Sequence, residues 1–432
     1  MTLRSLCRAG YTLGIATVGL TAPASAQGNA HDREIENLSH RRDVQLAFRV
    51  IDELEPTTLA DHIMLTQIPA PPFMEEVRAE KFAEMLREAG ADSVWIDEVG
   101  NVLALRRGRG ERTVAIDAHL DTVFPEGTDV SVRISGDTLF APGIGDDTRG
   151  LIVILTVLRA MNAAEIETTS DLLFIGAVGE EGLGDLRGVK HLFRDGGPRI
   201  DSWIAVDGGT TGRVVHRGLG SHRYRVTFKG PGGHSWGAFG LGNPQHALGR
   251  AIQLFVDAAD PYTASGIRTS YNVGRIGGGT SVNSIPFEAW MEVDMRSESP
   301  ERLDGIDALF RRAMGDALDQ ANRLRRQGDA LTVDVDMIGN RPSGATPEDT
   351  PLVQRALAAT NHFGVVPNLD IASTDSNIPI SLGIPAVTIS RGGAGSGGHA
   401  LSEFWVNENG AIAIKQALLL LAAEAGLAEL VN

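Results

Sequence analysis

Histidine and acidic residues follow or adjoin several short, β-rich runs of this sequence, where strands of one sheet are expected to end. They are His119, Asp146, Glu181, Asp207 and His399. In an open α/β sheet, ligands bind at the carboxyl ends of the strands. Imidazole nitrogens and carboxylate oxygens are good ligands for divalent cations. The sequence therefore predicts that these five residues meet at one edge of a sheet and hold metal ions there.

Glu180 and Glu181 are adjacent and follow the apolar run 172–178. Burying two like charges together is costly unless one of them binds a cation or takes up a proton. A ligand role for one glutamate and a general-base role for the other would remove that cost.

Two further acidic pairs have alternative explanations. In His119-Leu120-Asp121, alternation along an extended chain puts both polar side chains on one side, so Asp121 is expected to hold the second ring nitrogen of His119. A hydrogen-bonded turn would have the same sequence. Asp146 and Asp147 precede an apolar helix, where acidic residues also serve as N-terminal caps. A phosphate loop is disfavoured, because no Lys-Ser/Thr follows and two carboxylates repel phosphate.

The bulk composition fits a folded soluble enzyme. The chain has 432 residues, of which 42% are hydrophobic and 22% charged, with a formal net charge of −16. Such a negative field opposes binding to nucleic acid or to anionic lipid. We therefore expect neither as a partner.

Residues 1–26 have the pattern of a signal peptide, with Arg4 and Arg8 before the apolar run 11–20 and small residues at 24–26. The apolar run is shorter than the roughly 20 residues needed to span a bilayer. The sequence predicts a secreted or periplasmic protein without a membrane anchor once the signal is cleaved.

The only cysteine, Cys7, lies inside this signal. The mature chain would then lack a thiol, which excludes a cysteine nucleophile and thiolate zinc ligands. A serine hydrolase is disfavoured as well, because Ser396 lies in a glycine-rich run without the Gly-x-Ser-x-Gly pattern.

The order of predicted elements indicates an α/β protein with an insertion. Strands and helices alternate over residues 27–216, which predicts a sheet covered by helices on both faces. Residues 217–340 read β-α-β-β-α-β, the order of a four-stranded antiparallel sheet with two helices. The α/β pattern resumes over 341–432. We expect one catalytic domain in two parts with a second domain inserted between them.

The ordered set of His119, Asp146, Glu180-Glu181, Asp207 and His399 resembles the M20 family of metallopeptidases, which includes glutamate carboxypeptidases, tripeptide aminopeptidases, aminoacylases and acetylornithine deacetylase-like enzymes. The resemblance covers most of the mature chain. It implies a zinc-exopeptidase-like α/β/α catalytic domain and an inserted ferredoxin-like α+β lid domain that forms a homodimer.

The resemblance also implies how two Zn²⁺ ions would be held, with Co²⁺ or Mn²⁺ as possible substitutes. His119 and Asp207 would bind one ion, Glu181 and His399 the other, and Asp146 would bridge both.

Further roles follow from the same resemblance. Glu180 would be the general base and Asp121 would orient His119. His234 would donate to the oxyanion, typically in the neighbouring subunit's site. The peptide bond Asp146–Asp147 would be cis.

Substrate contacts are implied for Asn283 and Arg296, although a structural salt bridge explains Arg296 equally well. Asp375 would support the second metal without binding it. The chain departs from well-known members at Asp207-Gly208-Gly209, where many have Glu-Pro, and in the glycine-rich run 391–398.

The resemblance thus implies a dinuclear-metal hydrolase that cleaves amide bonds of small peptides or N-acyl amino acids. The alternatives are an N-acyl-amino-acid deacylase rather than a peptidase, and a non-catalytic binding protein of the same fold. A binding protein would be expected to lose Glu180 or a ligand, and all are present.

Overall fold

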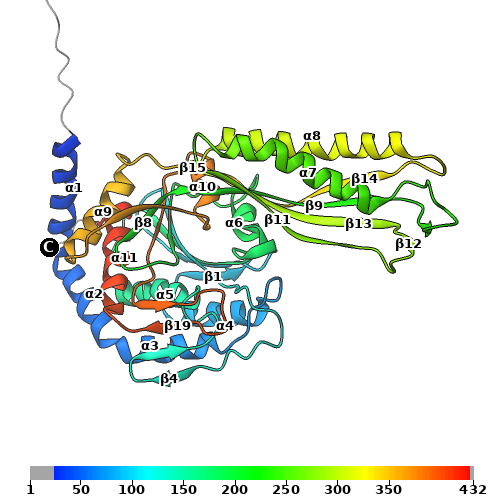
Figure 1. The fold of residues 1–432 in the computed structure, drawn as a ribbon. Coiled ribbons are helices and arrows are strands. Elements are labelled where there is room, and N and C mark those ends of the chain that lie inside the picture. The colour runs from blue at the N-terminus through cyan, green and yellow to red at the C-terminus, as the bar shows by residue number, and fades with distance from the viewer. Residues whose placement is uncertain (1–23, 429–432) are drawn as a thin grey trace, which may run out of the picture.

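The computed structural model describes residues 24–428. They form a body of α/β layers from which an elongated unit, residues 220–341 and here called the arm, projects to one side (Figure 1). Residues 1–23 of the predicted signal peptide lie outside the described residues, and 24–26 begin helix α1 (Ala24–Ser39).

A nine-stranded sheet forms the centre of the body, in the order β1-β2-β6-β3-β7-β17-β8-β15, with β16 also paired to β8. The central strands β6, β3, β7 and β17 run parallel, so their carboxyl ends share one edge. The strands are β1 (Ser93–Ile96), β2 (Val102–Arg106), β3 (Thr113–His119), β6 (Asp171–Ala177), β7 (Ser202–Val206), β8 (Arg213–Gly218), β15 (Gly344–Ala345), β16 (Asn368–Ala372) and β17 (Ala386–Ile389).

Both faces of this sheet are buried, which explains why its central strands are continuously apolar. In β6, Leu172 and Phe174 pack into the core under one set of helices, whereas Leu173 and Ile175 pack into a separate core on the other face. The first face is covered by α1, α2 (Arg42–Glu53), α4 (Glu76–Glu88), α5 (Thr148–Ala163), α9 (Pro351–His362) and α11 (Gly410–Ala425). The second is covered by α6 (Arg187–Leu192) and α10 (Asn377–Ser381). The predicted α/β/α architecture is confirmed.

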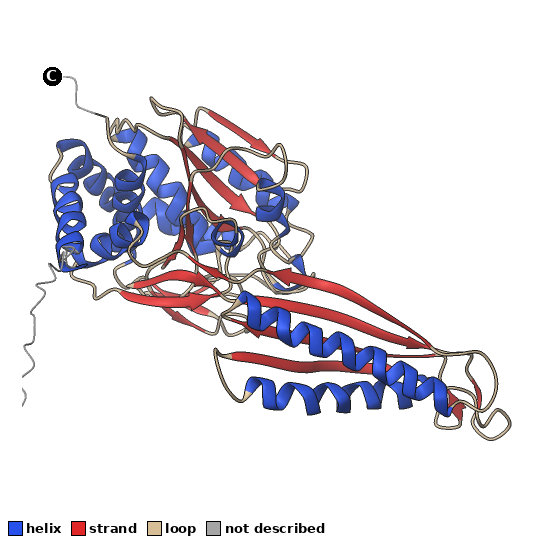
Figure 2. Ribbon diagram, turned by 90° about the horizontal axis from the view of Figure 1, so that it is seen from above, coloured by secondary structure: helices blue, strands red, loops and turns tan. Residues whose placement is uncertain are grey.

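The arm is a four-stranded antiparallel sheet in the order β11-β13-β9-β14, with helices α7 and α8 along one face (Figure 2). Its elements are β9 (Gly220–Lys229), α7 (Pro244–Thr263), β11 (Thr269–Gly278), β13 (Glu288–Ser297), α8 (Pro300–Leu324) and β14 (Thr332–Arg341). Strand β13 alternates strictly between buried and half-buried residues, as expected for a sheet covered on one face. The arm therefore has a hydrophobic core of its own.

Some local predictions were wrong. Apolar residues recur at helical spacing over residues 47–65, which predicts one helix there, but the chain forms α2 and then α3 (Glu55–Thr66). Pro56 explains the break, because proline lacks an N–H and its ring clashes with the carbonyl four residues earlier. Helix α1 and the strands β8 and β16 were not predicted.

Short strands were missed as well, since three residues carry too little pattern to be recognised. A small sheet consists of β4 (Arg133–Ser135), β5 (Thr138–Phe140), β18 (Ala394–Ser396) and β19 (Phe404–Val406). A two-stranded pair, β10 (Gly233–His234) and β12 (Ser284–Ile285), lies at the far end of the arm. Within residues 24–428, no helix combines the length and apolarity that crossing a bilayer requires.

Replacing Phe310 by alanine should test the arm core. The fully buried ring lies with its centroid 4.9 Å from that of Tyr224 and 5.2 Å from that of Phe255. The cavity left behind should lower the free energy of unfolding by about 3–5 kcal/mol. Leu324→Ala, at the exposed end of the same helix, should cost less than about 0.5 kcal/mol. Urea unfolding followed by circular dichroism measures both, and equal losses would contradict the assignment of this core.

Candidate metal centre

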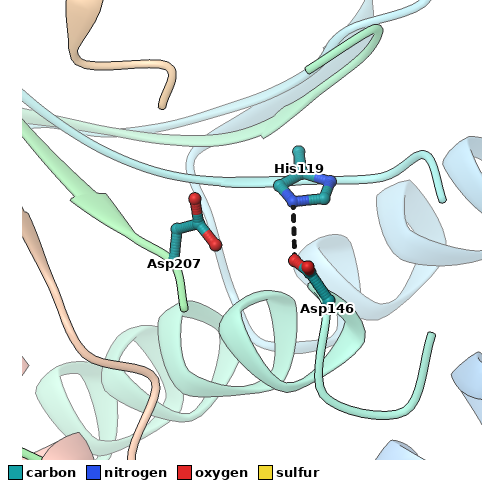
Figure 3. A group of neighbouring side chains, drawn as sticks. All are labelled: His119, Asp146 and Asp207. Carbon is teal, nitrogen blue, oxygen red and sulfur yellow. Dashed lines mark ion pairs between the residues drawn. The ribbon is translucent and has the colours of Figure 1, made fainter. Parts of the chain in front are cut away.

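Three of the predicted ligands converge at the carboxyl edge of the main sheet. His119 ends β3, Asp207 follows β7, and Asp146 lies just ahead of α5. Each offers one ligand atom such that all three atoms lie within 4.8 Å of one another. Figure 3 shows these side chains pointing toward a common space. Three stretches distant in sequence therefore form one candidate metal-binding triad.

A second triad shares Asp146. Asp146, Glu181 and His399 also bring one ligand atom each within 4.8 Å. Nε2 of His399 lies 2.7 Å from Oε1 of Glu181 and 3.4 Å from Oδ2 of Asp146, while Nε2 of His119 lies 3.3 Å from Oδ1 of Asp146. All five predicted ligands are thus brought together, with Asp146 between the two histidines.

The cluster attracts positive charge. Burial opposes protonation of His119, but the hydrogen bond to Asp146 and the surrounding carboxylates hold the pKa of His119 well above its usual range. Hydrogen bonds to Asp146 and Glu181 raise the pKa of His399 to about 10. Burial and the neighbouring charge of Asp146 raise the pKa of Asp207. In the absence of metal ions, the negative charges of the carboxylates raise the pKa of neighbouring groups, so that these groups keep their protons.

Asp121 acts differently from the expectation. Nδ1 of His119 lies 3.0 Å from the main-chain oxygen of Asp121 and 3.7 Å from its carboxylate. A carbonyl oxygen can only accept, so Nδ1 donates to it, and Nε2 is the ring nitrogen that faces the cluster. The carboxylate of Asp121 instead accepts from the main-chain N–H groups of Glu180 and Glu181, at 3.0 and 2.9 Å. Asp121 thereby positions both glutamates as well as the imidazole.

The sequence left open whether Asp146 and Asp147 are metal ligands or helix caps, and the structure gives the two residues different positions. Asp147 caps α5 and accepts from the N–H of Gly150, whereas Asp146 belongs to the ligand triads. The peptide bond between them is cis, as expected. Glu403, not singled out from the sequence, accepts from the N–H groups of Gly143, Gly145 and Asp146 at 2.7 to 2.9 Å.

Glu180 is buried and forms an ion pair with Arg341, a residue that the sequence did not single out. Nη1 of Arg341 donates to Oε1 of Glu180 at 3.0 Å, and its Nη2 donates to the main-chain oxygen of the same residue. Burial raises the pKa of Glu180 well above its usual range, and Arg341 opposes that rise. Glu180 and Glu181 also group with His119 within 4.8 Å. Glu180 therefore lies beside the triads, held by an arginine from the end of β14.

A cavity of about 330 Å³ opens onto these residues. It is lined by Val123, Asp146, Glu180, Glu181, Gly182, Asp207, Arg223, Arg296, Arg341, Ser373 and His399. Arg223, Arg296 and Arg341 come from the arm sheet, so body and arm both contribute walls. The volume suits a small substrate.

The predicted substrate residues have different positions. Arg296 lines the cavity and also donates to Asp294 at 2.8 Å, so the expected salt bridge is present and the contact with substrate stays a prediction. His234 and Asn283 are exposed near the far end of the arm and do not line the cavity (Figure 1). Nδ1 of His234 accepts from the N–H groups of Trp236 and Gly237, which leaves Nε2 free to donate. Asp375 is buried and belongs to neither triad.

Four residues that sequence reasoning missed contribute to the site. They are Arg223, Arg341, Arg391 and Glu403. Arg391 follows the apolar strand β17 by two positions, the same signal that revealed the ligands, whereas Arg341 is the last residue of the half-exposed strand β14. Nothing local distinguishes Arg223 or Glu403 from ordinary surface residues.

Comparison with known proteins agrees with the geometry. The model of peptidase family M20/M25/M40 matches residues 115–422. Carboxypeptidase G2 of a Pseudomonas species is 25% identical over 228 residues, 51% of this chain and 54% of that protein. A protein named as a LysW-lysine/LysW-ornithine hydrolase of Pyrococcus abyssi is 35% identical over 128 residues, 30% of this chain and 34% of that protein. The chain thus spans between about a third and about half the length of these relatives.

Solved structures share the fold. Aminopeptidase PepT of Bacillus cereus has a TM-score of 0.68 at 20% identity, covering 85% of this chain and 98% of that one. The dipeptidase Dug1p of Saccharomyces cerevisiae has a TM-score of 0.67 at 16% identity, covering 88% and 98%. Because the family model matches the chain from within β3 to within α11, the chain belongs to peptidase family M20/M25/M40, a family of metal-dependent hydrolases.

Proposed function

We propose that this chain is a dinuclear metal-dependent hydrolase that cleaves amide bonds in small peptides or N-acyl amino acids, acting as an exopeptidase. The observation that carries the proposal is a pair of ligand triads that share Asp146, with Glu180 in the same cavity. A binding protein of the same fold would have no need of the buried glutamate beside the ligands.

The residues fit two divalent cations. The donors are imidazole nitrogens and carboxylate oxygens, which suit Zn²⁺, with Co²⁺ or Mn²⁺ as substitutes. His119 and Asp207 would hold one ion, Glu181 and His399 the other, and Asp146 would bridge them. The hydrogen bond from Nδ1 of His119 to a main-chain oxygen orients the ring so that Nε2 faces the cluster, where it would bind a cation after losing its proton. The raised pKa of His399 supports a second triad that stabilises positive charge.

The protein's own groups can carry the proton transfers. Divalent cations in such a site polarise the scissile carbonyl and acidify the attacking water. Glu180 takes the proton from that water and passes it to the leaving nitrogen. Arg341 and the main-chain hydrogen bonds to Asp121 keep the Glu180 carboxylate in place for both transfers.

The cavity walls favour a substrate with a free carboxylate. Arg296 and Arg223 both donate to Asp294, at 2.8 and 2.9 Å, and both line the cavity. Two guanidinium groups share the carboxylate of Asp294, which leaves a net positive charge on this wall of the cavity. Peptides with a free C-terminus and N-acyl amino acids provide the matching group. A deacylase is the second candidate, because the same wall would bind the carboxylate of an N-acyl amino acid.

The far end of the arm supports a homodimer. His234, in β10, and Asn283, just before β12, are exposed there, beside the exposed side chains of Trp236, Phe239 and Val282. We propose that a second copy covers this end, where His234 would donate to the oxyanion and Asn283 would contact substrate in the partner's site. We also propose that the protein is exported, on the pattern of residues 1–26.

Glu180→Gln should abolish turnover without loss of metal. It removes the base and keeps the size of the side chain, so kcat should fall by about 100-fold or more. Glu84→Gln, on the exposed surface of α4, should keep full activity. Activity on a panel of dipeptides, tripeptides and N-acyl amino acids, together with metal analysis, measures both. Full activity of the Glu180→Gln variant would exclude the proposed mechanism.

Chelation should inactivate the enzyme reversibly. Removing divalent ions leaves the carboxylates of the two triads without their main counter-charge, so both activity and unfolding temperature should fall. Added Zn²⁺ should restore both, with two ions bound per chain by elemental analysis. Activity that survives complete removal of metal would contradict the proposal.

Arg296→Met should act on binding more than on chemistry. Losing charged hydrogen bonds to a substrate carboxylate should raise KM about tenfold or more for substrates with a free α-carboxylate. Amides of the same substrates should show no such change. An equal effect on both substrate types would assign Arg296 a structural role through Asp294.

A further inference from the structure

Arg391 lies against two of the candidate ligands. It follows β17 by two positions, and its Nη1 is 3.5 Å from Oδ1 of Asp146 and 4.0 Å from Oδ1 of Asp207. Its side chain is only 16% exposed. The guanidinium therefore belongs to the carboxylate cluster and not to the surface.

The neighbouring loop is shaped to admit this guanidinium. A Cβ at Gly145 would lie 2.9 Å from Nη2 of Arg391 and 3.0 Å from Oε1 of Glu403, so no larger residue fits there without displacement. Glu403 accepts from three N–H groups of the loop that carries Asp146. Its negative charge also favours the charged guanidinium. Arg391 therefore packs beside the loop that carries Asp146, which Glu403 fixes in place.

The charge of Arg391 is permanent, because a guanidinium does not lose its proton in proteins. Before any metal binds, it offsets part of the repulsion between Asp146 and Asp207. When a divalent cation binds the same two carboxylates, Arg391 repels that cation across a short distance. One side chain therefore stabilises the metal-free cluster and weakens metal binding.

We propose that Arg391 is a positioning residue that holds the Asp146 and Asp207 carboxylates in place before metal binds and lowers the affinity of the His119–Asp146–Asp207 site for its cation. This inference rests on the proposed metal centre. Arg341 does not substitute for it, because that guanidinium pairs with Glu180.

Two variants separate charge from shape. Arg391→Gln keeps a hydrogen-bonding side chain but removes the charge, and Arg391→Lys keeps the charge. Competition with a chromophoric chelator measures the Kd for Zn²⁺, and thermal unfolding is followed for metal-free and zinc-loaded protein. R391Q should bind Zn²⁺ about tenfold tighter or more, and its metal-free form should unfold at a lower temperature than wild type. R391K should stay near wild type in both measurements.

Unchanged or weaker zinc binding by R391Q would overturn the inference, as would equal destabilisation of its metal-free and zinc-loaded forms. An R391Q protein that fails to fold even with zinc present would also contradict it, because bound cations should replace the missing charge. Wild-type protein that binds no zinc would overturn the proposed function itself. The other outcomes leave that function intact and reject only the role of Arg391.

Discussion

Mutual repulsion among carboxylates is the constraint around which this site is built. The parallel strands β3, β6 and β7 end at one edge, and their ends or the adjoining loops place Asp146, Glu181 and Asp207 close together. Like charges gathered in a partly buried space raise the free energy unless cations or protons accompany them. Protonated imidazoles, arginines and the proposed metal ions all supply positive charge that offsets this repulsion. The same field that would disfavour folding of an uncompensated cluster would give the proposed site its affinity for divalent cations.

A second set of carboxylates holds the first set in place. Asp121 accepts from the main chain at Glu180 and Glu181, Asp147 caps α5, and Glu403 accepts from the loop that carries Asp146. None of these three belongs to a ligand triad among the described residues. Each uses its charge on main-chain N–H groups, so the ligand side chains are fixed by hydrogen bonds rather than by loop stiffness alone. Such support is what a metal site needs to keep its geometry.

The arm contributes to chemistry as well as to shape. Arg341, at the end of β14, pairs with Glu180, and Arg223 and Arg296 line the cavity from β9 and β13. The cavity therefore combines an acidic floor from the body with a basic wall from the arm. This division suits the proposed amide substrate, whose carbonyl would meet the ligand cluster while its carboxylate would meet the arginines. Any displacement of the arm relative to the body would alter the proposed base and the proposed substrate wall together.

The α/β pattern, the inserted β-α-β-β-α-β order and all five candidate ligands could be predicted from the residue types and their spacing alone. These features are local: apolar runs report strands, and polar residues just after such runs report the active edge of a sheet. The remaining features of the site depend on contacts between distant parts of the chain. Asp146 and Asp147 have the same sequence context, and only the folded loop shows that one faces the cluster and the other caps a helix. Arg391 and Glu403 meet Asp146 across more than 240 residues of chain, and Asp121 acts through a main-chain oxygen. Contacts of that kind depend on how distant segments pack, which no local pattern of residue types records.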